Sequence, residues 1–262
     1  MDHDHESRAA PADDLPGIAP VGPALASVTD SDLRAAEAVL GRVCLPAAEE
    51  LGLLLRDQAG AWRRKNIATT LSRAKGELEQ AAAEGHCAAP RLIMESLNQA
   101  SWTEDSQVQE MWAGLLVSSC AAGGTDDSNW IFICLLRELT PMQARILRYA
   151  CEAAQKVVFP DGLIGAEPLR CDSAIVCKLA NCDDVHRIDR ELDHLRTLGL
   201  LQSGFDSFSP VTAAGGGLEA DLQPTGLALQ MYVRTRGSRH TPNEFFSVPQ
   251  PVSEPQVEPP LQ

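Results

Sequence analysis

The chain has 262 residues, of which 44% are hydrophobic, enough for one large or two modest globular domains. Its formal net charge of −14, from 22 Lys and Arg against 36 Asp and Glu, disfavours nucleic acid and acidic membranes as partners, because both attract cations. The longest apolar run, 130–136, has seven residues, whereas a membrane-spanning helix needs roughly 20. The acidic start, MDHDHESRAAPADD, lacks the basic and apolar regions of a signal peptide. We therefore expect a cytoplasmic protein without a membrane span.

The N-terminal part predicts a disordered tail and then a helical domain. Residues 1–28 are rich in Ala, Pro and Asp and could bury little apolar area. The helical domain is expected over 29–139, and a short helix from Asp30 to about Leu40 begins it. Its main element is one long helix over 45–84, whose apolar residues recur at three- and four-residue steps and share one face. These residues are Leu51, Leu54, Leu55, Ala59 and Trp62.

Three further helices complete this domain. Pro90 suits a first helical position and begins the first of them. Ser101 and Glu104 have the spacing of a capping box and predict the start of the second. Ser128 can cap the third, a buried helix over 129–139. The second has the clearest amphipathic pattern, formed by Val108, Met111, Trp112, Leu115, Leu116 and Ser119.

A second domain is predicted over 140–237. Thr140 followed by Pro141 is typical of a helix start, as an N-cap and a first-turn proline. Three helices are expected, at 142–154, 173–181 and 185–198, with a short strand at 157–159. A hairpin then pairs two segments around a glycine-rich tip, and a last helix follows. The paired residues are Leu200 and Leu201 with Leu218 and Leu222.

The order of these elements predicts the fold class. Three helices and a hairpin, in that order, are typical of a winged helix-turn-helix. The expected architecture is therefore mainly α: an N-terminal helical unit with one long helix, and then a winged-helix-like domain with a small β-hairpin. Residues 238–262 contain many Pro, Glu and Ser, and we expect a second disordered tail.

One dense basic cluster lies on the predicted long helix. It comprises Arg56, Trp62, Arg63, Arg64, Lys65 and Asn66. One interpretation is a binding site for an anion or a protein partner. The alternative is a solvated helix flank whose cations pair with local acids such as Asp57 and Glu49.

Four side chains of the second domain merit a test for zinc, which takes four N or S ligands in a tetrahedron. They are Cys171, Cys177, Cys182 and His186, in the spacing C-x5-C-x4-C-x3-H. This is not a zinc-knuckle spacing, and none of the eight cysteines forms a CxxC pair. We therefore expect buried thiols, no metal site and no cofactor.

The charge of the second domain argues against DNA binding. Residues 140–237 carry 10 Lys and Arg and 12 Asp and Glu, and the expected recognition helix is also acidic overall. A helix that reads DNA usually brings cations to the phosphates. Enzyme motifs such as G-x-S-x-G, the P-loop and H-E-x-x-H are missing from the sequence. We therefore expect the protein to act through contact with a protein partner or as a homo-oligomer.

Several segments together resemble the abortive infection alpha (Abi-alpha) family of prokaryotic proteins. They are LPAAEELGLLLRDQAGAWRRKN, LNQASWTEDSQVQEMWAGLLVSS, FICLLRELTPMQARILRYA and LQPTGLALQMYV, and they span most of 40–235. The resemblance implies a role in abortive infection or a related anti-phage response, without catalytic residues to carry over. The alternative functions are a winged-helix DNA-binding transcriptional regulator and an uncharacterised toxin enzyme.

Overall fold

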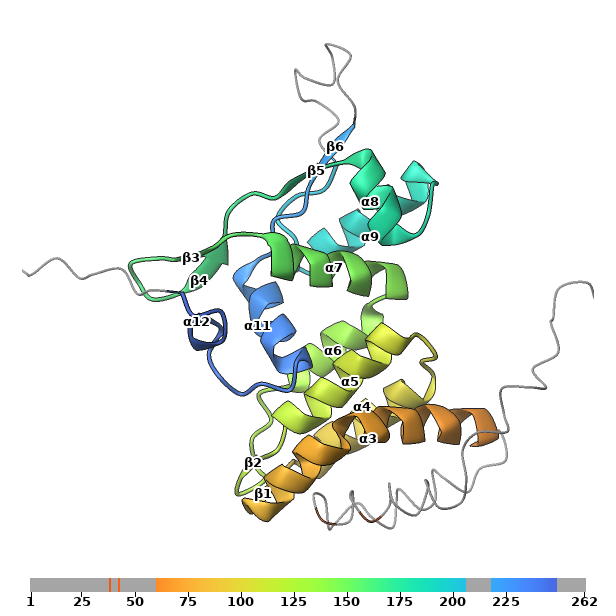
Figure 1. The fold of residues 1–262 in the computed structure, drawn as a ribbon, viewed down its shortest axis with the longest axis vertical. Coiled ribbons are helices and arrows are strands. Elements are labelled where there is room, and N and C mark those ends of the chain that lie inside the picture. The colour runs from red at the N-terminus through yellow and green to blue at the C-terminus, as the bar shows by residue number, and fades with distance from the viewer. Residues whose placement is uncertain (1–37, 39–41, 43–59, 206–217, 249–262) are drawn as a thin grey trace, which may run out of the picture.

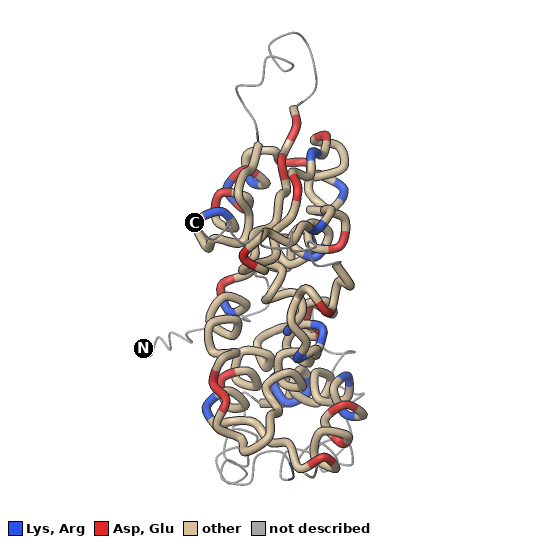
Figure 2. The backbone as a smooth tube through the Cα atoms, turned by 90° about the vertical axis from the view of Figure 1, so that its left-hand side faces the viewer, with Lys and Arg blue, Asp and Glu red and all other residues tan. Residues whose placement is uncertain are grey.

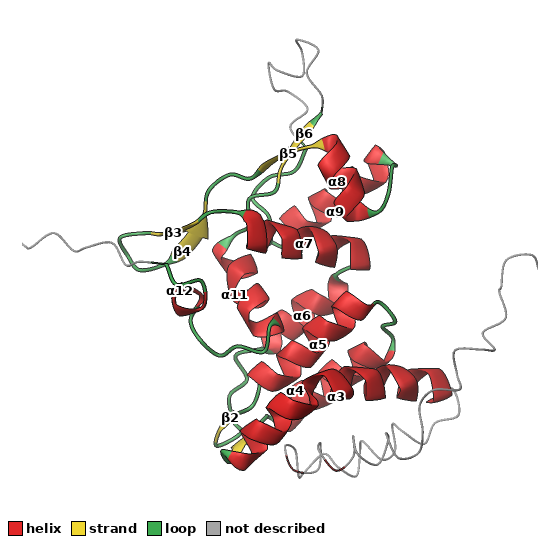
Figure 3. Ribbon diagram, viewed as in Figure 1, coloured by secondary structure: helices red, strands yellow, loops and turns green. Residues whose placement is uncertain are grey.

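The computed structural model describes residues 60–205 and 218–248, together with Ala38 and Arg42. Helices dominate the described residues, and three short antiparallel strand pairs accompany them (Figure 3). The mainly α class is therefore confirmed. Apart from Ala38, which is helical, the predicted helix up to Leu40 falls on residues that are not described, and so does the start of the long helix, over 45–59.

The N-terminal helices stack at one end of the molecule (Figure 1). They are α3 (Gly60–Ala83), α4 (Pro90–Ser101), α5 (Ser106–Ser118) and α6 (Trp130–Glu138). β1 (His86–Cys87) pairs with β2 (Ala121–Ala122) beside them. The stripe on α3 that begins at Ile67 and ends at Leu78 is buried against Leu97 of α4 and Leu116 of α5. This part of the fold rests on the helical periodicity of the apolar residues.

Two predicted caps in this unit are wrong. Ser101 does not start α5, because it is the last residue of α4 and is fully buried. The N-cap of α5 is Asp105, whose carboxylate accepts hydrogen bonds from the first-turn N–H groups of Gln107 and Val108. The N-cap position of α6 is held by Asn129 rather than Ser128. Four residues, 102–105, separate α4 from α5, so α5 starts beyond the predicted position.

The C-terminal elements continue the stack along the long axis (Figure 1). They are α7 (Pro141–Ala153), β3 (Lys156–Val158), β4 (Ile164–Ala166), β5 (Arg170–Asp172), α8 (Ser173–Ala180), α9 (Val185–Thr197), β6 (Glu219–Asp221), α11 (Gly226–Thr235) and α12 (Pro242–Phe245). Thr140 caps α7, as the sequence predicts, and the structure adds a reciprocal capping box with Gln143. Asp172 and Asp184 are the N-caps of α8 and α9, and each carboxylate accepts a hydrogen bond from one backbone N–H group, that of Ile175 and that of Arg187 respectively.

The two segments of the predicted hairpin lie antiparallel in a register that differs from the expected one, and the predicted glycine-rich tip falls on residues that are not described. Leu201 forms a bridge with Pro224 and Phe205 forms one with Ala220, so residues 201–205 run antiparallel to 220–224. The expected pairing of Leu200 and Leu201 with Leu218 and Leu222 is therefore wrong. β6 also pairs with β5, which the sequence did not reveal. The strand β5 has only three residues, too few for its polar–apolar alternation to predict a strand.

One hydrophobic cluster crosses from the N-terminal helices into the C-terminal ones. It includes Trp112 of α5, Leu147 of α7 and Leu192 of α9, all almost completely buried. α12 lies within the segment 238–262, for which we expected a tail. Its neighbour Phe246 stacks on Tyr232 of α11, with ring centroids 5.9 Å apart. Among the described residues, no helix combines the length and the apolar character needed to cross a bilayer.

Candidate functional site

The structure brings part of the predicted basic cluster into a compact group at the end of α4. We call this group the tryptophan–arginine cluster. It consists of Trp62, Arg63 and Asn66 from α3 and of Asn98, Ser101, Trp102 and Glu104 from α4 and the turn after it. Arg64 and Lys65 are half-buried on α3, and Arg56 falls on residues that are not described.

Arg63 is held by neutral groups at the centre of the cluster. Its Nε donates to Ser101 Oγ over 3.0 Å, and its Nη2 donates to Asn98 Oδ1 over 3.1 Å. The guanidinium carbon lies 4.4 Å from the centroid of the Trp102 ring. A cation over the face of an indole is attracted by its quadrupole. The guanidinium is therefore fixed in both position and orientation.

Trp102 is the exposed member of the cluster. Its exposed fraction is 58%, although it is one of the largest apolar side chains in the protein. The Trp62 ring lies beside it, with centroids 6.0 Å apart and planes tilted by 56°. The Trp62 indole N–H in turn donates to the Glu104 carboxylate. The Trp102 ring thus faces solvent from a rigid support, which lowers the entropy lost when a partner binds it.

Asn66 has a structural position in the same cluster. Its exposed fraction is 3%, and its Nδ2 donates to the Ser101 backbone oxygen over 2.9 Å. That oxygen belongs to the last turn of α4, where carbonyl groups lack partners within the helix. Asn66 therefore joins α3 to the end of α4 and supports the residues around it.

The predicted zinc ligands do not assemble. Cys171 is buried in β5, Cys177 and Cys182 are half-buried, and His186 is exposed. Within the described ranges, no group of three or more His, Cys, Asp or Glu could hold a metal ion. Burial raises the pKa of the Cys171 thiol, which keeps it protonated and hydrogen-bonded with Tyr149.

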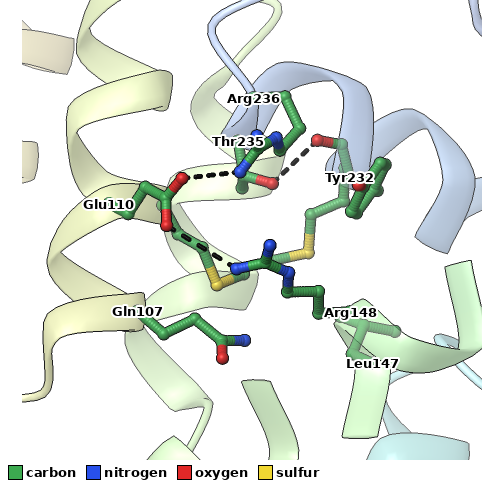
Figure 4. A pocket seen from close by; sticks show the side chains of 9 residues that line it. Gln107, Glu110, Leu147, Arg148, Tyr232, Thr235 and Arg236 are labelled. Carbon is green, nitrogen blue, oxygen red and sulfur yellow. Dashed lines mark hydrogen bonds and ion pairs between the residues drawn. The ribbon is translucent and has the colours of Figure 1, made fainter. Parts of the chain in front are cut away.

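A second polar site, which sequence reasoning missed, lies where α5, α7 and α11 meet. Figure 4 shows the Glu110 carboxylate of α5 pointing between two arginines. Its Oε1 accepts from Arg236 Nη1 over 2.6 Å, and its Oε2 lies 3.6 Å from Arg148 Nη1. We call this site the Glu110 junction. Since Glu110 and Arg236 are 126 positions apart, no local pattern could have indicated it.

Glu152 extends the Glu110 junction on the other side of Arg148. Its Oε1 accepts from Arg148 Nε and from the Tyr232 hydroxyl, both over 2.9 Å. Burial, helped by the hydrogen bond and the charge of Glu152, raises the pKa of Tyr232 to about 12. The space that remains is about 20 Å³, room for one water molecule. The network therefore fills the junction and clamps the three helices together.

The surface of α9 carries both signs of charge, and Figure 2 shows acidic and basic residues interleaved along the described backbone. Arg196 Nη2 lies 2.8 Å from Asp193 Oδ1 on the same helix. Glu191 accepts a hydrogen bond from the Thr140 hydroxyl over 2.9 Å, which ties α9 to the start of α7. Three of the charged side chains of α9 are thus engaged within the protein.

The model of a family described as abortive infection alpha matches residues 63–221. The matched segment begins at Arg63, includes Trp102 and Glu110, and stops before α11. No curated protein and no solved structure matches the chain.

Proposed function

The chain belongs to the abortive infection alpha family, and from this premise we propose that it acts in abortive infection or a related anti-phage response in the cytoplasm. We further propose that it acts by contact with another protein, without a chemical reaction of its own. The family supports the first part of this proposal, and the surface of the molecule supports the second.

The observation that carries the contact mechanism is the exposed Trp102 ring on its rigid support. Trp and Arg are the residue types most enriched among those that dominate the energy of protein interfaces. Here Arg63 and Trp62 hold the ring in place while 58% of the Trp102 surface stays open. Such a side chain can enter a pocket of a partner at little cost in conformational entropy.

The C-terminal unit, with its boundary at residue 140, is proposed to be a winged helix that binds protein. The order α7, β5, α8, α9, the segment 201–205 and β6, with the strand pair β3 and β4 inserted after α7, supports this topology. The acidic residues of α9 and of its N-cap, among them Asp193 and Asp184, favour a protein partner over a polyanion.

A plaque assay tests the proposal in cells that express the protein. Trp102→Ala is expected to lower protection against a sensitive phage by at least about 10-fold, the effect of removing about 1.4 kcal/mol of binding. Ile175→Ala is the matched control, because Ile175 is an exposed apolar residue (41%) on α8, far from the cluster in the sequence. Circular dichroism of both purified variants checks the fold.

Two outcomes would overturn the proposal. Full protection by folded Trp102→Ala would remove the contact surface from the mechanism. Tight DNA binding in a mobility-shift assay, weakened by salt, would show that the C-terminal unit is a DNA-binding regulator and does not act by contact with a protein.

A further inference from the structure

Helix α6 is apolar on both of its faces. Its sequence is WIFICLLRE, and Phe132, Ile133 and Leu136 make up its buried side. A surface helix normally turns polar residues outward. On α6 the outward side instead carries Ile131, which is 50% exposed, and three half-buried residues. We call this side the α6 face: Trp130, Ile131, Cys134 and Leu135.

We infer that the α6 face is a self-association surface, on which a second copy of the chain packs with its own α6 antiparallel. A twofold contact of this kind joins the same patch on both copies, so it needs only one patch that is complementary to itself. Residue 134 is the midpoint of α6 (Trp130–Glu138). The twofold axis therefore passes near the two Cys134 side chains.

The charges at the two ends of α6 suit an antiparallel arrangement. At the amino end, the Arg91 guanidinium carbon lies 3.5 Å from the centroid of the Trp130 ring. At the carboxyl end, the Glu138 carboxylate is exposed and lies 3.8 Å from Arg137. An antiparallel pair brings Arg91 of one copy toward Glu138 of the other, and the symmetry repeats this attraction. A parallel pair would place like charges together.

The overall charge of the protein explains why this patch suits a second copy. Two chains of −14 repel each other wherever acidic surfaces meet. Around the α6 face, Arg91 and Arg137 balance Glu95 and Glu138, so two copies can approach there without this penalty. Trp and Arg, both present beside this axis of approach, are also among the residue types enriched in protein interfaces.

This inference goes beyond the proposed function and is separable from it, because self-association is measured on purified protein and the surface differs from that of Trp102. Sedimentation equilibrium from about 1 to about 200 µM is expected to show a monomer–dimer equilibrium. Ile131→Asp should weaken association by at least about 10-fold, because it places two carboxylates in an apolar contact. Ile175→Asp, at a comparably exposed isoleucine on α8, should leave it unchanged.

Charge reversal tests the antiparallel arrangement itself. Arg91→Glu or Glu138→Arg alone should weaken the dimer, and both together should restore it, with circular dichroism confirming the fold of each variant. A short bismaleimide should link two native chains through their Cys134 side chains, and Cys134→Ser should abolish that link. Cys87, Cys177 and Cys182 are also partly exposed and remain in this variant, so they serve as an internal control. A monomer at every concentration, a dimer that Ile131→Asp leaves intact, or failure of the double reversal to restore association would overturn the inference.

Discussion

Gly114 marks the closest approach between α5 and α11, and replacing it with alanine tests whether these helices pack as described. A Cβ at this position would lie 1.9 Å from the Thr235 carbonyl oxygen and 2.9 Å from the Gly237 nitrogen. Both are backbone atoms, so neither can rotate away as a side chain could. To restore an ordinary contact, the two helices must separate by roughly 1.5 Å.

The expected magnitude follows from two opposing effects. Alanine within a helix is favoured over glycine by up to about 1 kcal/mol. Overpacking a dense core costs about 1–3 kcal/mol, occasionally more, and a rigid backbone obstacle places Gly114→Ala at or above the upper end. The net loss of unfolding free energy is therefore about 2 kcal/mol. For a protein of this size, that corresponds to a fall in Tm of about 4–8 °C.

Urea and thermal unfolding followed by circular dichroism measure this effect. The control is Gly76→Ala, the same substitution in α3, where an added Cβ would meet no atom within 4 Å. That variant should be more stable than the wild type by about 0.5–1 kcal/mol, because only the helix preference acts. If Gly114→Ala were as stable as the wild type, the close approach of α5 and α11 would be refuted.

Three further predictions concern the polar sites. Arg63→Met removes two hydrogen bonds and the stacking on Trp102, so the unfolding free energy should fall by about 1–2 kcal/mol. Acrylamide should also quench the tryptophan fluorescence of this variant more strongly, and unchanged quenching would contradict the rigid support of Trp102. Glu110→Gln removes exposed ion pairs and should cost less than about 1 kcal/mol, a difference that disappears at about 1 M salt. Burial and Glu152 raise the pKa of Tyr232 from 10.0 to about 12, so the folded state favours the protonated phenol. The stability that this preference contributes is lost as the pH rises from 10.0 through about 12. Tyr232→Phe should therefore show a smaller alkaline loss of stability in denaturant titrations, and identical pH profiles would exclude this role for Tyr232.

The candidate site was only partly predictable. The sequence indicated Trp62, Arg63 and Asn66 because a tryptophan interrupts the one dense run of cations. It did not indicate Trp102, which provides the exposed surface and directly follows a different helix, α4. The contacts between these helices depend on how α3 crosses the end of α4, and no pattern within either segment encodes that crossing.

The sequence by itself determined where most helices begin and which sides of them are buried. Thr140, Asp172 and Asp184 each accept a hydrogen bond from the N–H group three positions on, so the information that starts a helix is local. Only the tertiary structure decided the pairing of Glu110 with Arg236 and the third strand beside β6, because both join segments distant in the chain. Such contacts form only after the apolar faces have packed, and that packing is a property of the whole chain.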